Sequence, residues 1–264
     1  MHEPDVLSLQ EAFAASDDAA ELLSRDKSAS QLVDATSSSL GALLELLLLK
    51  RSAKGTITIR DKSPRGQLLR ELLASEAAFS CADGLGVYHA APGRAATASE
   101  AVDFAEQARI ALKMAGVVDT ASWRLSGALR ELLDNVDEHG GRTATCLAGY
   151  FVQPRQAWLC VADTGDGVLA GYAKTGSNSI PVDAQEALHW AVVRHRSRTG
   201  LPERGTGFQS VVSALRSLDG SLRVRSDDAS IELEQRGSTV DVLMREQGQL
   251  PGFVVSMHLR WRDA

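Results

Sequence analysis

Glu131, Asn135 and His139 are spaced four residues apart, so in a helix their side chains lie on one face. A glutamate can orient or deprotonate a nucleophile, and an asparagine oxygen is a hard ligand that suits Mg²⁺. The spacing therefore indicates chemistry on a phosphate group. Taken alone, however, the same residues would also fit an ordinary solvated helix face.

A helix over residues 122–138 has to present these side chains. Its apolar residues recur at helical spacing, which predicts an amphipathic helix with one buried side. An acid and an amide in line on such a helix can both be aimed into one cavity. The apolar residues are Leu125, Leu129, Leu132, Leu133 and Val136.

A second segment, with Asp163, Gly165 and Gly167, follows an apolar, strand-like run over residues 157–162. A carboxylate at a strand end only accepts hydrogen bonds, so it suits a donor such as the adenine amino group. The glycines let the backbone pass close to a planar ring, because no Cβ intervenes. The alternative is an ordinary Asp/Gly turn after a strand.

A third segment, Arg204, Gly205, Thr206 and Gly207, precedes a predicted helix over residues 208–218. Glycines at a helix start expose backbone N–H groups and the positive end of the helix dipole, which suits a phosphate. Neither the dinucleotide fingerprint nor the Walker loop fits this segment. The order of the three segments favours one nucleotide pocket over three unrelated features.

The three segments resemble the N, G1 and G2 boxes of the GHKL ATPases, which include gyrase, sensor histidine kinases and mismatch-repair ATPases. The resemblance covers residues 122–264 and implies ATP and Mg²⁺ as cofactors. It implies that Glu131 is a general base or water-orienting acid and that Asn135 is the Mg²⁺ ligand. In the other two boxes it implies that Asp163 binds adenine, that Gly165 and Gly167 line the purine, and that Gly205, Thr206 and Gly207 hold phosphates, with Arg204 as a further phosphate contact.

Residues 168–204 fall where this superfamily keeps a mobile ATP lid, and they are rich in Gly, Ser, Lys and Arg. The candidates for phosphate contact there are Lys174, Arg196, Arg198 and Arg204. One departure from the family concerns a Gly-Thr pair before the last strand, whose threonine helps to bind adenine. Here Phe253 follows Gly252.

Alternating or apolar runs predict further strands at 145–151, 221–226, 231–234, 239–243 and 253–261. The order of helices and strands suits an α/β sandwich with a mixed sheet, as in the superfamily. The expected fold class is therefore α/β, with a C-terminal two-layer sandwich of the GHKL (Bergerat) ATP-binding type. The expected domains are residues 1–92, a linker and connecting helix over 93–120, and the ATP-binding domain over 121–264.

The N-terminal third predicts a helix over 39–50, a strand over 56–60 and a helix over 63–74, which implies a βαβ-type layer. Residues 31–79 resemble the core of STAS domains, the anti-anti-sigma-factor modules. In that family a serine near the helix start is phosphorylated, and Ser38 lies nearest that position. Thr36 stands where the family has Asp. For the serines at 37–39 we therefore favour capping of the following helix as their role.

Bulk properties narrow the function classes. A net charge of −6 and a pI near 5.6 argue against nucleic acid as a partner. The three cysteines, Cys81, Cys146 and Cys160, are widely spaced, which favours reduced, buried thiols and a cytoplasmic location. The apolar run 40–49 is too short to cross a bilayer, which takes about 20 residues, so we expect a buried helix.

The leading hypothesis is a cytoplasmic ATP-binding regulatory protein that resembles the anti-sigma serine kinases, or a slow ATPase. Its expected partner is a STAS-type or sigma-factor-type protein. The alternative is a non-catalytic switch in which ATP occupancy changes a partner surface. A third hypothesis is a hydrolysing machine that forms a homodimer. A sensor histidine kinase needs a phosphoacceptor histidine on a helical hairpin, and neither His2 nor His89 fits that position.

Overall fold

The computed structural model describes most of the 264-residue chain. The described residues are 9–36, 38–52, 54, 56–74, 79–82, 84–90, 98–139, 145–174, 180–194, 206–216, 218–236 and 238–261.

The chain is mixed α/β, and the described strands form one large sheet and one small one. The large sheet has six strands in the order β3-β4-β5-β6-β8-β7. Their bounds are Phe79–Ala82 for β3, Leu85–Ala90 for β4, Cys146–Gln153 for β5, Gln156–Asp163 for β6, Asp219–Arg236 for β7 and Thr239–Arg260 for β8.

All neighbouring strands of this sheet are antiparallel, so the prediction of a mixed sheet was wrong for the described residues. For three of the five pairs the reason is the length of the connection. The pairs β3-β4, β5-β6 and β7-β8 are each joined by only two residues, and such short turns can only join antiparallel strands. The pairs β4-β5 and β6-β8 are antiparallel although long segments separate their strands in the chain.

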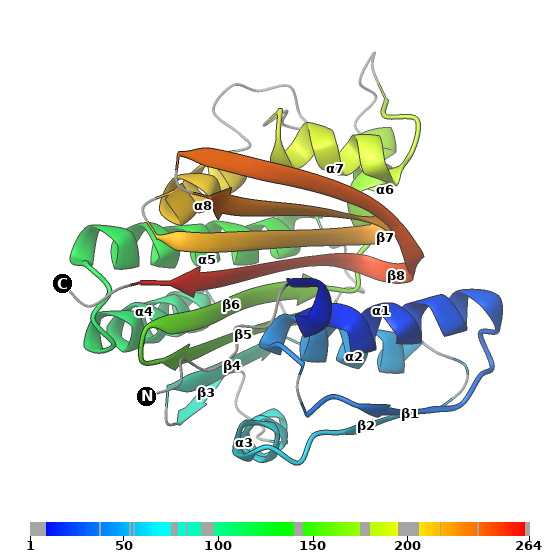
Figure 1. Cartoon of the computed structure of the whole chain (residues 1–264), viewed down its shortest axis with the longest axis horizontal. Coiled ribbons are helices and arrows are strands. Elements are labelled where there is room, and N and C mark those ends of the chain that lie inside the picture. The colour runs from blue at the N-terminus through cyan, green and yellow to red at the C-terminus, as the bar shows by residue number, and fades with distance from the viewer. Residues whose placement is uncertain are drawn as a thin grey trace.

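Helices cover both faces of the sheet (Figure 1). One face lies under α4 (Ala98–Met114), α5 (Asp119–His139) and α8 (Thr206–Arg216), and the other lies under α1 (Leu9–Arg25) and α2 (Leu40–Ser52). This placement explains why β6 is apolar at nearly every position, since successive side chains point to opposite buried faces.

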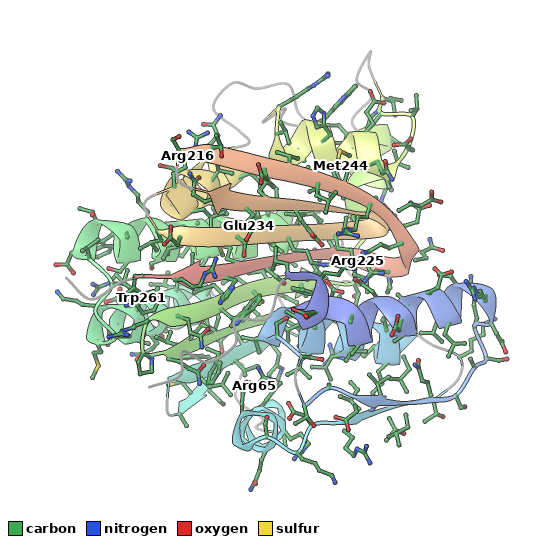
Figure 2. All side chains as sticks on the ribbon, in the orientation of Figure 1. Arg65, Arg216, Arg225, Glu234, Met244 and Trp261 are labelled. Carbon is green, nitrogen blue, oxygen red and sulfur yellow. The ribbon has the colours of Figure 1, made fainter. Side chains whose placement is uncertain are left out.

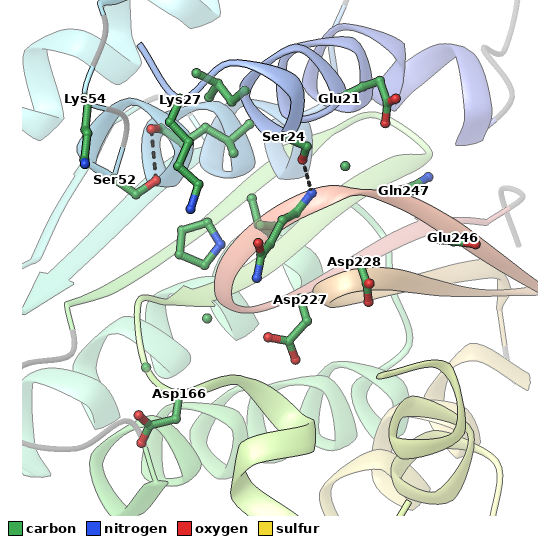
Figure 3. Close-up of a pocket in the computed structure, with 18 residues that line it drawn as sticks. Glu21, Ser24, Lys27, Ser52, Lys54, Asp166, Asp227, Asp228, Glu246 and Gln247 are labelled. Carbon is green, nitrogen blue, oxygen red and sulfur yellow. Dashed lines mark hydrogen bonds between the residues drawn. The ribbon is translucent and has the colours of Figure 1, made fainter. Parts of the chain in front are cut away.

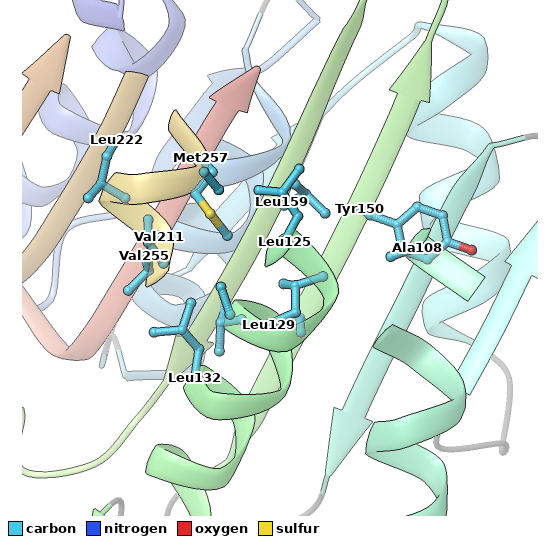
Figure 4. Close-up of a cluster of buried hydrophobic side chains, with 14 of the residues drawn as sticks. Ala108, Leu125, Leu129, Leu132, Tyr150, Leu159, Val211, Leu222, Val255 and Met257 are labelled. Carbon is cyan, nitrogen blue, oxygen red and sulfur yellow. The ribbon is translucent and has the colours of Figure 1, made fainter. Parts of the chain in front are cut away.

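The alternation is visible along β6 and β8. Leu159 and Val161 join the core under α4, α5 and α8, together with Val255, Met257 and Leu125 (Figure 4). The intervening residues of β6, Cys160 and Ala162, join the core under α1 and α2.

The face under α1 and α2 also buries charged side chains. Arg225 lies on the side of β7 that α1 covers (Figure 2) and donates to Glu45 of α2 and to Asp17 of α1, each at 2.9 Å. Arg223 donates to Glu232 at 2.7 Å and to Asp17 at 2.6 Å. We call this set the charged cluster; its members are Asp17, Glu45, Arg223, Arg225, Glu232 and Gln247.

The N-terminal part contains the predicted βαβ unit. Strands β1 (Gln31–Asp34) and β2 (Ile57–Arg60) pair in parallel, α2 connects them, and α3 (Pro64–Leu73) follows. Helix α2 is buried on almost every side, which confirms the buried helix expected from its apolar run. Strands β3 and β4 precede residue 92, but they belong to the large sheet. The predicted division into domains at residues 92 and 121 stays a prediction.

The strands expected at 221–226 and 231–234 are parts of one long strand, β7, and those at 239–243 and 253–261 are parts of β8. The pairing of β7 with β8 is irregular between Ser226 and Ala229, and Asp227 has a positive φ of 55°. The long hairpin bends at this point (Figure 1). Polar residues at the bend interrupt the alternation, which is why the sequence pattern split each strand in two.

Two of the three cysteines are buried free thiols, as predicted, and burial raises the pKa of Cys160 to about 12. Cys81 is exposed, because it lies on the edge strand β3. No described helix is both long enough and apolar enough to span a membrane.

Candidate functional site

Helix α5 presents Glu131 and Asn135 beside its buried stripe. On its other flank, the Ser126 hydroxyl donates to the Ala105 carbonyl of α4 at 3.0 Å, so that flank faces α4. Asn135 lies nine residues further on, which is two and a half turns, so it is on the opposite flank. Because α5 lies between α4 and α8 (Figure 1), that flank faces α8. Asn135 is exposed and Glu131 is half-buried.

Asp163 ends β6 as the sequence predicts, and its carboxylate is buried with only 7% of the residue exposed. The Gly165 N–H donates to Asp163 Oδ1 at 2.6 Å. The Thr145 N–H donates to Thr164 Oγ1 at 2.8 Å, which ties the loop to the start of β5. The carboxylate is therefore held in a fixed place at one end of the sheet.

Two glycines permit the close packing around this loop. Gly252 has a φ of +80°, and a Cβ there would lie 1.9 Å from the Asp163 carbonyl oxygen. Gly167 has a φ of +79°, and a Cβ there would lie 2.8 Å from both Ser226 Oγ and Asp227 Oδ2. Neither position can carry a side chain without displacing the loop. That Gly165 and Gly167 line a purine stays a prediction.

The third segment meets the second through a pair of aromatic rings. Thr206 and Gly207 begin α8, and the next residue, Phe208, packs edge-on against Phe253 with ring centroids 6.1 Å apart. Phe253 pairs directly opposite Asp163 in the sheet. The start of α8 therefore lies beside the Asp163 strand end. Four predicted basic or glycine contacts lie outside the described residues: Arg196, Arg198, Arg204 and Gly205.

The predicted lid contains two helices rather than only a loop. These are α6 (Gly167–Lys174) and α7 (Ala184–Val192), which pack together through Tyr172 and Trp190 with ring centroids 5.8 Å apart. Lys174, a predicted phosphate contact, forms an exposed ion pair with Asp166. Its ammonium group would have to leave this pair to reach a phosphate.

A groove with a volume of about 680 Å³ borders the same loop on the side of α1 and α2. In Figure 3, Asp166, Asp227 and Asp228 lie on one side of it and Lys27 and Lys54 on the other. Its lining includes Gly165 and Asp166 but not Glu131, Asn135 or Asp163. We therefore do not assign the nucleotide to this groove.

A magnesium ion bound with a nucleotide requires few ligands from the protein. Among the described residues, no three His, Cys, Asp or Glu side chains form a group that could hold a metal ion. Mg²⁺ in nucleotide sites takes one or two protein ligands and fills its shell with phosphate oxygens and water. An exposed amide such as that of Asn135 fits that requirement.

Sequence reasoning missed Ser226 and Asp227 as neighbours of this site. The Val168 N–H at the start of α6 donates to Ser226 Oγ at 3.0 Å, and Ser226 is fully buried. The available signal was the Ser-Asp-Asp run that ends the alternation at 221–226, but such a run is also typical of a turn.

No protein-family model matches the chain, and no curated protein matches it either. Function is therefore inferred from the residues of the site and their positions.

Proposed function

We propose that the chain is an ATP-binding regulatory protein of the GHKL type that uses Mg²⁺. The observation that supports it is the proximity of the second and third segments: Phe208 at the start of α8 contacts Phe253, which lies opposite Asp163. Helix α5, which carries the first segment, packs against α8. This arrangement is compatible with one pocket built from all three segments.

Each residue has a role that its position permits. The buried Asp163 carboxylate would accept a hydrogen bond from the adenine amino group, and backbone N–H groups at the start of α8 would hold phosphates. Asn135 would hold the Mg²⁺ ion. When bound, Mg-ATP supplies a transferable phosphoryl group whose charge the metal offsets. Glu131 would orient or deprotonate the attacking hydroxyl or water.

The proposed activity is transfer of phosphate to a serine of a STAS-type or sigma-factor-type partner, or slow ATP hydrolysis. Ser38 is a poor acceptor within the chain, because it is only 6% exposed. Its neighbour Ser39 caps α2, since the Ala42 N–H donates to Ser39 Oγ at 3.1 Å, as the capping interpretation predicts. The burial of Ser38 favours a separate partner as the acceptor, and the STAS-like fold of the N-terminal part stays part of the proposal.

The first test is a calorimetric titration of Mg-ATP against the wild type, Asp163→Asn and Asp103→Asn. Replacing the charged carboxylate by a neutral amide should weaken binding about tenfold in Asp163→Asn, since one hydrogen bond to a charged group is worth about 1.5 kcal/mol or more. Asp103→Asn is the control for the loss of one negative charge, because Asp103 is exposed on α4. Equal affinities of Asp163→Asn and wild type would reject the adenine site.

The second test distinguishes catalysis from switching. The wild type and Glu131→Ala are incubated with Mg-ATP and a STAS-type protein, and the products are analysed by mass spectrometry. Phosphoprotein supports the kinase and ADP alone supports the ATPase, and either product should disappear in Glu131→Ala while binding remains. Binding without any product in the wild type supports the alternative, a non-catalytic switch.

A further inference from the structure

Two consecutive residues of β7 connect the N-terminal helices to the loop at the proposed nucleotide site. Side chains alternate along a strand, so Arg225 and Ser226 point to opposite faces of the sheet. Both are fully buried. Arg225 faces α1 and α2, and Ser226 faces the start of α6.

On the first face, Arg225 is held by three elements. Its Nη1 donates to Asp17 Oδ1 of α1 and to Glu45 Oε2 of α2, each at 2.9 Å. Its Nη2 donates to the Gly248 carbonyl of β8 at 2.6 Å. Gly248 in turn packs directly on α1, because a Cβ there would lie 2.3 Å from the Ala20 carbonyl carbon. The backbone of β7 at residue 225 is therefore fixed relative to both N-terminal helices.

On the second face, Ser226 holds the Asp163–Val168 loop by its end. Its hydroxyl accepts from the Val168 N–H at 3.0 Å and donates to the Gly252 carbonyl at 2.9 Å. Gly252 lies against the Asp163 carbonyl at the other end of the same loop. The Ser226 hydroxyl therefore links Val168, at the end of the loop, to Gly252, which packs against Asp163 at the start of the loop.

We propose that docking of α1 and α2 sets the shape of the Asp163–Val168 loop through Arg225 and Ser226, and so regulates nucleotide affinity. This inference rests on the proposed function, because the loop carries the predicted adenine ligand. Ser226 is a positioning residue in this scheme: it holds the loop and does not touch the nucleotide. The N-terminal helices are then the regulatory input of the site.

The first experiment removes the Ser226 hydroxyl with Ser226→Ala. Amide hydrogen exchange of Gly165 is the main readout, because Gly165 donates to Asp163 and does not bond to Ser226. We expect its exchange to accelerate about 3- to 10-fold and the affinity for Mg-ATP to fall by a similar factor, as for the loss of one hydrogen bond.

Ser230→Ala is the matched control. Ser230 lies on the same strand and is fully buried, and its hydroxyl has no hydrogen-bond partner. The Ser230→Ala variant should leave both the amide hydrogen exchange of Gly165 and the affinity for Mg-ATP unchanged. If Ser226→Ala lowers the melting temperature but leaves both readouts at the wild-type value, Ser226 is only structural and the inference is overturned.

The second experiment tests the input side with Asp17→Asn, which removes one charged acceptor of Arg225. Gly165 exchange should accelerate, whereas Asp18→Asn at the adjacent exposed position should have no effect. In a Ser226→Ala background, Asp17→Asn should add little, because both changes act on one path. Fully additive effects, or no effect of Asp17→Asn, would contradict a path through Ser226.

The two proposals fail separately. Hydrogen exchange needs no nucleotide, so a wild type that does not bind Mg-ATP would reject the proposed function while the link from α1 to the loop could still be measured. Unchanged Gly165 exchange in both variants would reject the link even if Mg-ATP binds.

Discussion

The face of the sheet under α4, α5 and α8 is filled by aliphatic and aromatic side chains, whereas the face under α1 and α2 also buries the charged cluster. Arg223 and Arg225 are among the largest fully buried side chains of the described residues. Burying ions costs desolvation free energy that an apolar core does not incur, so such a cluster seldom adds net stability.

The difference indicates what each face contributes. Aliphatic side chains tolerate small shifts, but a guanidinium bonded to two carboxylates and a carbonyl fits in only one place. We infer that the face under α4, α5 and α8 provides most of the buried apolar area. The face under α1 and α2 fixes where those helices lie on the sheet.

The largest expected effect comes from breaking the charged cluster with Arg225→Met. Glu45, which is fully buried, would then lose one of its guanidinium partners, and we expect a loss of about 3–5 kcal/mol in the free energy of unfolding. Urea denaturation monitored by circular dichroism measures it.

Arg60→Met is the control for that prediction, because Arg60 forms an exposed pair with Asp34. Exposed pairs of this kind contribute little. A loss in Arg225→Met no greater than in the control would remove the distinction between the two faces.

A smaller effect is expected from Leu129→Ala on the apolar face. Leu129 is fully buried among side chains of α5, β6 and β8 (Figure 4), and its truncation leaves a cavity. The cost should be about 3 kcal/mol, measured by the same urea denaturation. Leu32→Ala, at a position 59% exposed, should change stability little. A cost below about 1 kcal/mol would mean that this face collapses around the gap and is less closely packed than we infer.

The smallest effect concerns His258, which stacks on Trp158 at 4.2 Å under α1. Burial lowers the pKa of His258 to about 4, so the native state resists protonation. As pH falls from 6.5 to 4, the unfolded state binds this proton first, and the native state should lose roughly 2–3 kcal/mol of stability. His258→Phe keeps the stacking and should remove that loss.

The comparison must be made between variant and wild type at each pH. Burial raises the pKa of Asp17 to about 6, which gives a contribution of opposite sign that falls as pH rises from about 4 to 6. Because Asp17 is unchanged in His258→Phe, the difference between the two urea series isolates the histidine. Parallel series would contradict the lowered pKa.

The sequence predicts the apolar face well, because local periodicity and burial agree there. Helix α5 was expected over 122–138 and β6 over 157–162, and the observed elements, Asp119–His139 and Gln156–Asp163, contain these ranges. Asp163 falls at the strand end as predicted. The ligands themselves stay predictions, since ATP and Mg²⁺ contacts depend on segments such as Arg204–Gly205 that lie outside the described residues.

The other face could not be predicted from local patterns. The alternation at 221–226 predicts a half-buried strand, but Arg223 and Arg225 are also buried, because Asp17 and Glu45 face them. These partners lie 178 to 208 residues away in sequence. Helix α1 was also not predicted. Its acidic sequence gave no reason to expect that Asp17 would pair with arginines of β7.

The position of β8 has a consequence for how the chain folds during synthesis. This strand lies between β6 and β7 and carries the contacts of α1 at Gly248 and of α2 at Ser256. Of the described strands, it is also the last to leave the ribosome. Until residues 239–260 emerge, the leucine-rich surface of α2 has no complete sheet to cover it, so we expect the nascent chain to need protection from aggregation until this late stage of synthesis.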